Sequence, residues 1–257
     1  MKVLFIGDIV GGPGRKAVRQ YIGELRSQYR FDCCIANAEN AAGGSGITYA
    51  TAQELYGYGI DAVTMGNHTW SKKEINTFID ADPRIARPAN YPAELPGKGT
   101  VVIDGKLGVI SLLGRIYMEP VDCPFRTLDR ELEVLKRQVR AVIVDFHAEA
   151  TSEKCALAWY ADGRVSAVIG THTHVQTADE RILPCGTAFI SDAGMTGPRD
   201  GVIGVKKELV IEKFRTSMPV RFEVAKGPVQ FNGVILDIDE ETGKATGIHR
   251  ISNVFSV

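Results

Sequence analysis

Residues of the types that bind metal ions recur in this chain directly after short apolar runs. They are Asp8, Glu39, Asn40, Asn67, His68, His147, His172 and His174. Four of the five histidines lie at such positions, which random placement would not favour. Carboxylates, imidazoles and an amide oxygen at one place suit a pair of divalent first-row metals, with Fe, Mn and Zn as candidates. One carboxylate must then bridge the two cations, and a bridging hydroxide becomes the nucleophile.

Each of these residues also has an ordinary structural interpretation when it is taken alone. Asp8 can cap the glycine loop that follows it, and Glu39 can belong to a solvated turn because asparagine and glycines come next. Asn67 can cap a helix, and a single histidine such as His68 or His147 is often structural. Their shared position after different apolar runs favours a common site.

The motif GTHTH places two histidines one residue apart. If this segment is extended, side chains two apart share a face, so His172 and His174 would reach neighbouring metals. The alternative is a surface pair. Among the other polar residues, we expect Asp145 and His249 to be structural.

Two further residues follow glycines at predicted strand exits. Arg115 and Thr196 are candidates for a phosphate contact.

The first glycine loop raises a competing hypothesis, a dinucleotide-binding turn. Gly12, Gly14 and Ala17 form the order G-x-G-x-x-A, and Glu39 follows 22 residues after Ala17. However, the predicted strand ends near residue 7, too early for this fingerprint, and Pro13 removes one N–H from the loop. A Walker A pattern is absent, because no Gly-Lys-Ser/Thr follows. A dinucleotide-dependent oxidoreductase is therefore a distant alternative, and Asp8 becomes the residue of interest.

Strands and helices alternate through the first two thirds of the chain. Buried strands are predicted at 2–7, 32–37, 61–66, 142–146 and 167–171, and helices at 14–28, 48–58, 71–80 and 152–161. Ser71 with Glu74 forms a capping-box pattern, and Thr151 or Ser152 can cap the last helix. This alternation predicts an α/β sheet with parallel strands, in which ligands bind beyond the carboxyl ends of the strands.

The remaining segments look antiparallel. Residues 99–114 form two apolar runs around Asp104-Gly105-Lys106, which predicts a hairpin. Further strands are predicted at 187–192, 221–225, 229–238 and 246–251, joined by short turns. No linker or internal repeat interrupts the chain, so we expect a single domain over residues 1–257.

Composition narrows the function classes. With 257 residues and 44% hydrophobic content the chain can bury a substantial core, and a net charge of −1 argues against bulk nucleic-acid binding. Asp8 interrupts the N-terminal apolar run before a signal peptide or membrane span is complete, so a cytoplasmic protein is expected. Five cysteines without C-x-x-C spacing indicate reduced thiols rather than disulfides or a cysteine zinc site.

Taken together, the motifs resemble a known family along nearly the whole chain. They are FIGDIVGGPGR, NAENAAGGSGI, GNHTW, RPANYP, LLGRIYM, DFHAEATSEK, GTHTHVQTAD and DAGMTGP. This set is similar to the YmdB-type members of the calcineurin-like metallophosphoesterase superfamily. The resemblance implies a four-layer α/β/β/α sandwich of two mixed sheets flanked by helices, with a dinuclear metal site at one rim.

The resemblance also implies roles for the residues. Asp8, Glu39, Asn40 and His174 would hold one metal; Glu39, Asn67, His147 and His172 would hold the second, with Glu39 as the bridge. His68 would be the general acid that protonates the leaving oxygen. The implied metals are Fe or Mn, and the implied substrates are cyclic nucleotides, above all 2′,3′-cyclic AMP. Assembly into a homo-oligomer is also expected.

Two departures from the broader superfamily narrow the assignment. Val10 stands where other members carry a histidine ligand, and Glu39 replaces the usual bridging aspartate. Both are features of the YmdB type. Two alternative functions remain: a broader phosphatase or phosphodiesterase acting on linear esters, and a non-enzymatic nucleotide-sensing protein that acts through a partner in RNA metabolism.

Overall fold

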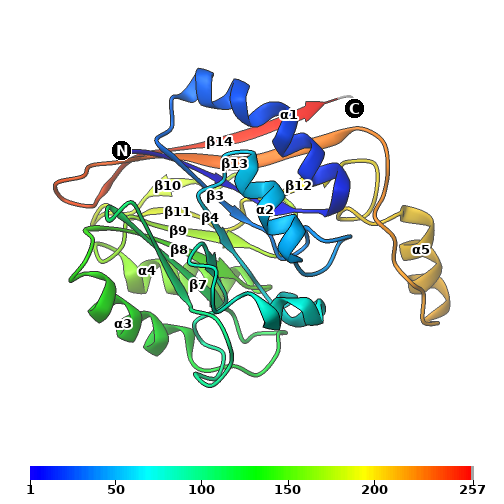
Figure 1. The fold of residues 1–257 in the computed structure, drawn as a ribbon, viewed down its shortest axis with the longest axis horizontal. Helices are drawn as coiled ribbons and strands as arrows, with labels where there is room; N and C mark the ends of the chain where they lie inside the picture. Colours follow the sequence, from blue (N-terminus) through cyan, green and yellow to red (C-terminus); the bar gives the residue numbers. More distant parts are fainter. Residues whose placement is uncertain (256–257) are drawn as a thin grey trace.

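Two β-sheets packed face to face form the centre of the molecule (Figure 1). The structure is a computed structural model, and it describes residues 1–255. Within these residues the larger sheet has eight strands, in the spatial order β2 (Asp8–Ile9), β12 (Met195–Pro198), β13 (Val229–Ile238), β1 (Lys2–Ile6), β3 (Cys33–Asn37), β4 (Ala62–Thr64) and β5 (Ile85–Ala86), with β14 (Ala245–Phe255) paired to β13. Strands β1, β3, β4 and β5 are parallel, whereas β13 runs antiparallel to β1.

The smaller sheet has six strands among the described residues. Their order is β10 (Arg181–Ile182), β11 (Ala188–Ile190), β9 (Ala167–Thr171), β8 (Ala141–His147), β7 (Leu107–Leu113) and β6 (Thr100–Ile103). The central strands β7, β8, β9 and β11 are parallel, and antiparallel strands flank them at both edges. The predicted hairpin over 99–114 is confirmed as β6 and β7.

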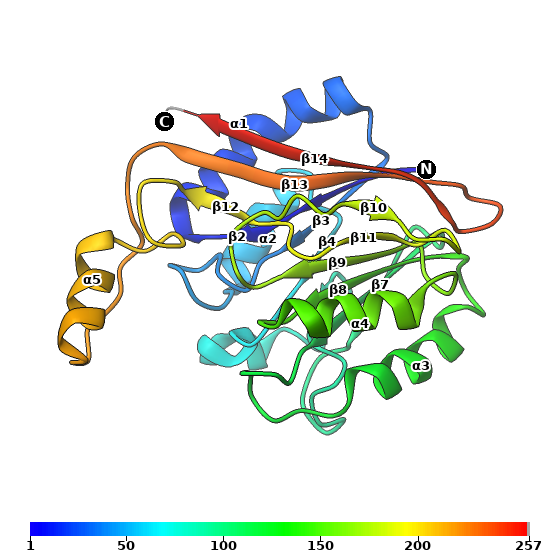
Figure 2. The ribbon, with the colours of Figure 1, turned by 180° about the vertical axis from the view of Figure 1, so that it is seen from behind.

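Helices cover the outer face of each sheet, which completes four layers (Figure 2). The helices α1 (Gly11–Tyr29) and α2 (Tyr49–Gly57) lie on the larger sheet, where Leu25 and Leu55 pack in one cluster with Leu4. The helices α3 (Pro124–Leu135) and α4 (Thr151–Ala161) lie on the smaller sheet, where Leu128 and Leu157 pack with strand residues. The predicted α/β/β/α sandwich is therefore confirmed.

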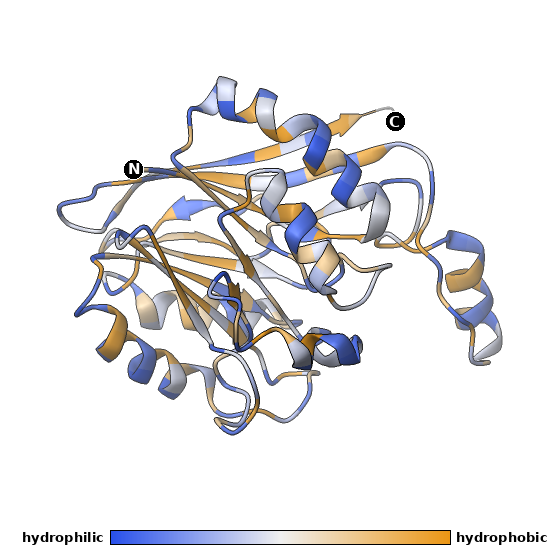
Figure 3. Cartoon of the chain, viewed as in Figure 1, coloured by the Kyte–Doolittle hydropathy of each residue, from blue (hydrophilic) through white to orange (hydrophobic). Residues whose placement is uncertain are grey.

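Apolar side chains from both sheets fill the space between them. Successive residues of a strand point to opposite faces, so Val3 and Phe5 of β1 enter this central core while Leu4 and Ile6 pack outward against the helices. A strand buried on both faces is apolar at every position. Figure 3 shows these strands as largely hydrophobic ribbons inside more polar helices. Among the described residues, no helix combines the length and hydropathy needed to cross a bilayer.

Several local predictions were wrong. Residues 71–80 form no α-helix but two short 3₁₀ helices, η1 (Thr69–Ser71) and η2 (Lys73–Thr77). Ser71 caps neither of them, and Glu74, its expected partner, accepts a hydrogen bond from the backbone N–H of Tyr49 at 3.1 Å. Helix α4 begins after Ala150 without a side-chain cap, so Thr151 and Ser152 are its first residues rather than its cap.

The C-terminal third also differs from the prediction. Strand β11, within 187–192, pairs parallel to β9 rather than antiparallel. Residues 221–225 form no strand, and only Val224 makes a bridge, to Val205. Two helices, α3 and α5 (Lys207–Thr216), were not predicted. Figure 1 shows α5 standing away from the sandwich, in the segment before β13.

Candidate metal centre

The predicted site residues meet where strands of both sheets end, at one rim of the sandwich. Asp8 comes after β1, Glu39 and Asn40 follow β3, and Asn67 and His68 follow β4. His147 is the last residue of β8, and His172 and His174 follow β9. All eight side chains belong to one connected set of polar contacts. The structure thus brings together every residue that the sequence singled out for the site.

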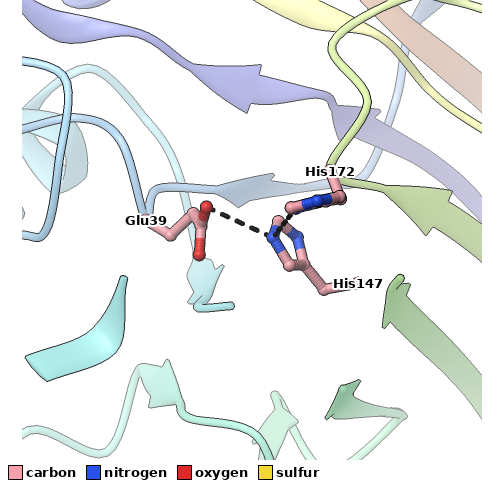
Figure 4. A group of neighbouring side chains, drawn as sticks. All are labelled: Glu39, His147 and His172. Atoms are coloured by element: carbon pink, nitrogen blue, oxygen red, sulfur yellow. Dashed lines mark hydrogen bonds and ion pairs between the residues drawn. The ribbon is translucent and has the colours of Figure 1, made fainter. Parts of the chain in front are cut away.

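Four of them, Glu39, Asn67, His147 and His172, form what we call the inner cluster. The Nε2 atom of His147 lies 3.2 Å from Glu39 Oε1, 3.0 Å from Asn67 Oδ1 and 3.1 Å from His172 Nδ1. Figure 4 shows how Glu39, His147 and His172 point toward one another. A single N–H on this nitrogen could satisfy only one of the three neighbours. The carboxylate and the two imidazoles form a group that can hold a metal ion.

Neighbouring groups direct the lone pairs of both imidazoles into the inner cluster. Thr171 donates its hydroxyl proton to Asp145 at 2.6 Å, so its oxygen accepts from His147 Nδ1 at 2.8 Å. In the neutral ring this leaves His147 Nε2 without a proton. His172 is held similarly, because its Nε2 lies 3.1 Å from a carboxylate oxygen of Glu149. When both rings are neutral, two ring nitrogens with lone pairs face each other, an arrangement that a cation would stabilise in place of the proton on His147.

The role expected for Asp145 is confirmed. This fully buried carboxylate receives hydrogen bonds from Thr171, from Asn37 at 2.9 Å and from the hydroxyl of Thr64. Its oxygens are occupied by protein donors, so Asp145 positions the neighbouring histidine from behind.

Gly66, the residue before Asn67, has no side chain, and part of the inner cluster occupies the space that a side chain there would fill. A Cβ atom at this position would lie 2.3 Å from Glu39 Oε2 and 2.4 Å from His147 Cδ2. Both atoms belong to fully enclosed side chains that cannot move aside. The glycine of the GNH motif is therefore a requirement of the site.

Asp8, Asn40 and His174 form the outer cluster. His174 Nδ1 donates to the carbonyl of Ile203 at 2.9 Å, and its Nε2 lies 3.3 Å from Asn40 Oδ1. The amide nitrogen of Asn40 donates to the carbonyl of Gly44 at 3.1 Å, which leaves Oδ1 as an acceptor facing an unprotonated nitrogen. Asp8 Oδ1 is buried and has no hydrogen-bond partner among residues 1–255. This orphaned carboxylate oxygen, in a group whose pKa His174 is near enough to lower, and the facing lone pairs of Asn40 and His174 fit a second cation.

The two histidines of GTHTH do not share a strand face, so that expectation was wrong. Both have positive φ angles, 104° at His172 and 66° at His174, in the loop after β9. Asp192 fixes this loop by accepting from the backbone N–H of Thr173 at 3.0 Å and from its hydroxyl at 2.8 Å. The ammonium group of Lys154, itself buried, donates to the same carboxylate at 2.8 Å.

Lys154 and Asp192 were missed as functional residues. The only sequence signal was the position of Asp192 just after the apolar run that forms β11. Such an acid is common in turns, and nothing in the sequence links it to a lysine in α4.

Charge and burial set the protonation of the inner cluster. Burial alone would raise the pKa of Glu39, but His147 and His68 hold it well below its usual range. Burial opposes the charged form of His147, yet the Glu39 carboxylate raises its pKa to about 9. Burial and the nearby His147 lower the pKa of His172 to about 3, so this ring stays neutral and available as a ligand. Burial also raises the pKa of Asp8 to about 6.

His68 occupies the open side of the centre, and 39% of its side chain is exposed. Its Nδ1 donates to Glu39 Oε1 at 2.9 Å, a hydrogen bond that raises the pKa of the imidazole against the effect of burial. No group of residues 1–255 bonds its Nε2. A cavity of about 300 Å³ lies beside this ring and is lined also by Glu39, Glu149 and His174.

The other candidates lie outside this cavity. Thr196 is buried in β12 and donates its hydroxyl to the carbonyl of Asn232 at 3.2 Å, so the phosphate contact suggested for it was wrong. Arg115 is exposed, and its backbone N–H donates to Glu153 at 3.0 Å. His249 lies on the exposed side of β14, away from the centre.

Known proteins resemble the whole chain rather than the centre alone. A 2′,3′-cyclic-nucleotide 2′-phosphodiesterase of Bacillus subtilis is 53% identical over 254 residues, which are 98% of this chain and 96% of the relative. A solved structure of a hypothetical protein from Thermus thermophilus superposes with a TM-score of 0.91 at 42% identity, covering 100% of this chain and 99% of the other. A structure described as a novel phosphatase of Mycoplasma pneumoniae gives a TM-score of 0.92 at 37% identity, covering 99% and 93%.

The family comparison agrees with these relatives. The model of the YmdB-like proteins matches residues 4–251, a range that includes every residue of both clusters. With this match and more than half of its residues shared with a full-length relative, the chain belongs to the YmdB-like protein family.

Proposed function

We propose that this protein is a dinuclear metal-dependent phosphodiesterase that hydrolyses cyclic nucleotides, with 2′,3′-cyclic AMP as its main substrate. The observation that carries the proposal is the convergence of Glu39, Asn67 and His172 on the Nε2 atom of His147, all within 3.2 Å. The name of the Bacillus subtilis relative supports the substrate class.

The donor set fits two divalent cations, for which we propose Fe or Mn, with Zn as the alternative. Asp8, Glu39, Asn40 and His174 would hold one ion; Glu39, Asn67, His147 and His172 would hold the other. Each oxygen of Glu39 accepts one hydrogen bond from His68, through its backbone N–H or its Nδ1. A carboxylate oxygen has a second lone pair, so Glu39 retains the capacity to bridge.

When bound, the two ions lower the pKa of a water and neutralise the charge of the phosphate oxygens. The protein contributes the proton for the leaving ribose oxygen, and we assign this task to His68. Its Nδ1 is anchored by Glu39, and its Nε2 is left to face the substrate in the cavity. Proton donation by a positioned histidine contributes roughly 10²–10⁴-fold to such reactions.

Hydrolysis of 2′,3′-cyclic AMP tests the proposal. Protein reloaded with Mn²⁺ or Fe²⁺ should release adenosine monophosphate, and a chelated sample should not. The variant His68→Ala should lose about 10²-fold or more in kcat while its metal content stays at the wild-type level. Equal loss of activity and metal would assign His68 as a ligand instead. Absence of turnover in protein that holds two metals would overturn the cyclic-nucleotide assignment.

A second candidate is hydrolysis of linear phosphoesters at the same centre. The name of the Mycoplasma pneumoniae structure, a phosphatase, favours it. Comparing kcat/KM for 2′,3′-cyclic AMP, 3′,5′-cyclic AMP and p-nitrophenyl phosphate separates the two. We also propose a cytoplasmic location, which is supported by five free cysteines in the described residues.

A further inference from the structure

A second cavity, of about 480 Å³, adjoins the metal centre. It shares four lining residues with the smaller cavity: Asn40, His68, His174 and Ile203. These four residues form a common wall between the two cavities. A ligand at the metal centre therefore lies next to the second cavity.

One side of this cavity is formed by residues 202–226, which we call the arm. The arm contains α5, and its two ends are joined by backbone hydrogen bonds from Lys206 to Glu223 and from Ala225 to Gly204, both 2.9 Å. Seen in Figures 1 and 2, α5 extends beyond the body of the sandwich. The arm therefore adds a wall to the site that the sandwich alone does not provide.

Close contacts fix the base of the arm against the glycine loops of the centre. A Cβ atom at Gly11 or at Gly44 would lie only 3.0 Å from the side chain of Val224, so both positions leave room for this valine. Both glycines also have positive φ angles. Ile203, also in the arm, accepts the hydrogen bond from the outer-cluster histidine His174. The arm thus contacts the same residues that the metal site uses.

The lining of this cavity is mostly aliphatic and aromatic. Val202, Val205 and Val210 contribute aliphatic surface, and Phe214 and Phe222 contribute rings. Phe214 is 80% exposed and Phe222 is also exposed, and both rings lie in the lining of this one cavity, where exposed apolar surface is gathered rather than scattered. Beyond the wall shared with the metal centre, the polar lining residues are Ser45, Lys213 and Glu223. The ammonium group of Lys213 lies 5.0 Å above the Phe222 ring, and Glu223 is paired with Lys206.

Such a lining suits a flat, largely apolar group with polar edges. Cavities of about 300–1,000 Å³ with apolar walls and a few polar groups are typical of small-molecule sites, and aromatic side chains stack on nucleobases of any sequence. We propose that this cavity is the nucleobase subsite of the enzyme, in which the base lies against Phe222 while the cyclic phosphate lies at the metal centre. The inference rests on the proposed function, because it requires a nucleotide substrate.

Two substrates separate base binding from phosphate chemistry. The first is 2′,3′-cyclic AMP, and the second is ethylene phosphate, which has the same five-membered cyclic phosphodiester without a nucleoside. In metal-loaded enzyme, Phe222→Ala should raise KM for 2′,3′-cyclic AMP at least about fivefold, as loss of base stacking predicts. The kcat/KM for ethylene phosphate should stay within about twofold of the wild type. The matched control Ile211→Ala, an exposed apolar residue of the arm that does not line the cavity, should change neither.

A second variant keeps the test informative if Phe222→Ala does not fold. Val202→Phe fills the cavity from its edge, and it should likewise raise KM for the nucleotide and spare ethylene phosphate. If both variants change the two substrates equally, or change neither, the base does not bind here. If Phe222→Ala alters the sedimentation coefficient and not the ratio of the two substrates, the cavity is covered by a second copy of the chain, and the proposal is overturned. A wild type that hydrolyses neither substrate would instead refute the proposed function itself.

Discussion

The inner and outer clusters offer the same kinds of ligand atoms but are held in place differently. In the inner cluster His147 ends a central strand, is 0% exposed and is oriented by Thr171, which Asp145 orients in turn. In the outer cluster His174 lies in a loop with a positive φ angle and is oriented by the main-chain carbonyl of Ile203, in the arm. The contrast between the clusters thus lies in these two histidines, because His147 is held by the sandwich and His174 by a loop that meets the arm.

This difference predicts different metal affinities. A ligand whose supporting hydrogen bonds lie in a packed core is already in its binding orientation, so little order is lost when the ion binds. Loop residues with solvent-exposed neighbours open more readily. We therefore expect the inner ion to be the tightly held one and the outer ion to be sensitive to the arm and to the substrate.

The largest effect is expected from Gly66→Ala, which removes the space of the inner cluster. The added methyl would displace Glu39 and His147, so we expect less than about 1% of wild-type activity and a loss of stability of about 1–3 kcal/mol. Activity, metal content and urea unfolding check this. A matched control is Gly12→Ala, where the added atom meets nothing within 4 Å. Full activity of Gly66→Ala would show that Glu39 and His147 do not lie against Gly66.

A smaller effect is expected when the support of His147 is removed and its ring is kept. Thr171→Val preserves shape but deletes the hydroxyl between Asp145 and the imidazole, so inner-metal affinity should fall about 10–100-fold. Thr187→Val is the control, because this buried hydroxyl bonds the carbonyl of Val165, outside both clusters. Competition with a metal-binding dye measures the affinities. Equal affinities in the two variants would mean that the relay does not position the ligand.

The smallest expected effect is the order in which the two ions leave. During dialysis against a chelator, the outer ion should dissociate at least about tenfold faster than the inner ion, because its histidine, His174, lies on a loop whereas His147 ends a buried strand. His174→Ala should remove the fast phase alone, and Thr171→Val should accelerate the slow one. The metal remaining per chain as a function of time gives both rates. If both ions are lost in a single kinetic phase, the two clusters do not differ in how tightly they hold a metal.

The sequence was informative about the site because of where parallel strands end. Asp8, Glu39, Asn67 and His147 each follow or end an apolar run, and strand ends of one direction converge at one rim. The resemblance of the motifs then indicated two mixed sheets, which the strand pattern alone did not separate. The ligand assignment to each metal stays a prediction.

Features that depend on tertiary contacts could not be predicted in this way. The hydrogen bond from Lys154 to Asp192 joins residues 38 positions apart in helix α4 and in the loop after β11. The positive φ angle of His172 follows from that loop and overrides the extended interpretation of GTHTH. The segment 71–80 carries a helical pattern, yet Glu74 bonds the start of α2 instead of a cap of its own.

The arm was the largest omission. The apolar run of 221–225 indicated a strand, but these residues form only one isolated bridge, between Val224 and Val205, and Phe222, Glu223 and Val224 line the cavity beside the centre. The side chains of Phe222 and Val224 line a cavity rather than a sheet face. A hydrophobic pattern alone does not distinguish the two.

Anomalous diffraction from crystals of the Mn²⁺-loaded protein tests the central claim most directly. Two peaks are predicted, one beside His147 Nε2 and one between Asn40 Oδ1 and His174 Nε2, with Glu39 next to both. The inner peak should have the higher occupancy after brief chelation. A map with no peak at either cluster, in crystals shown to contain manganese, would contradict the account.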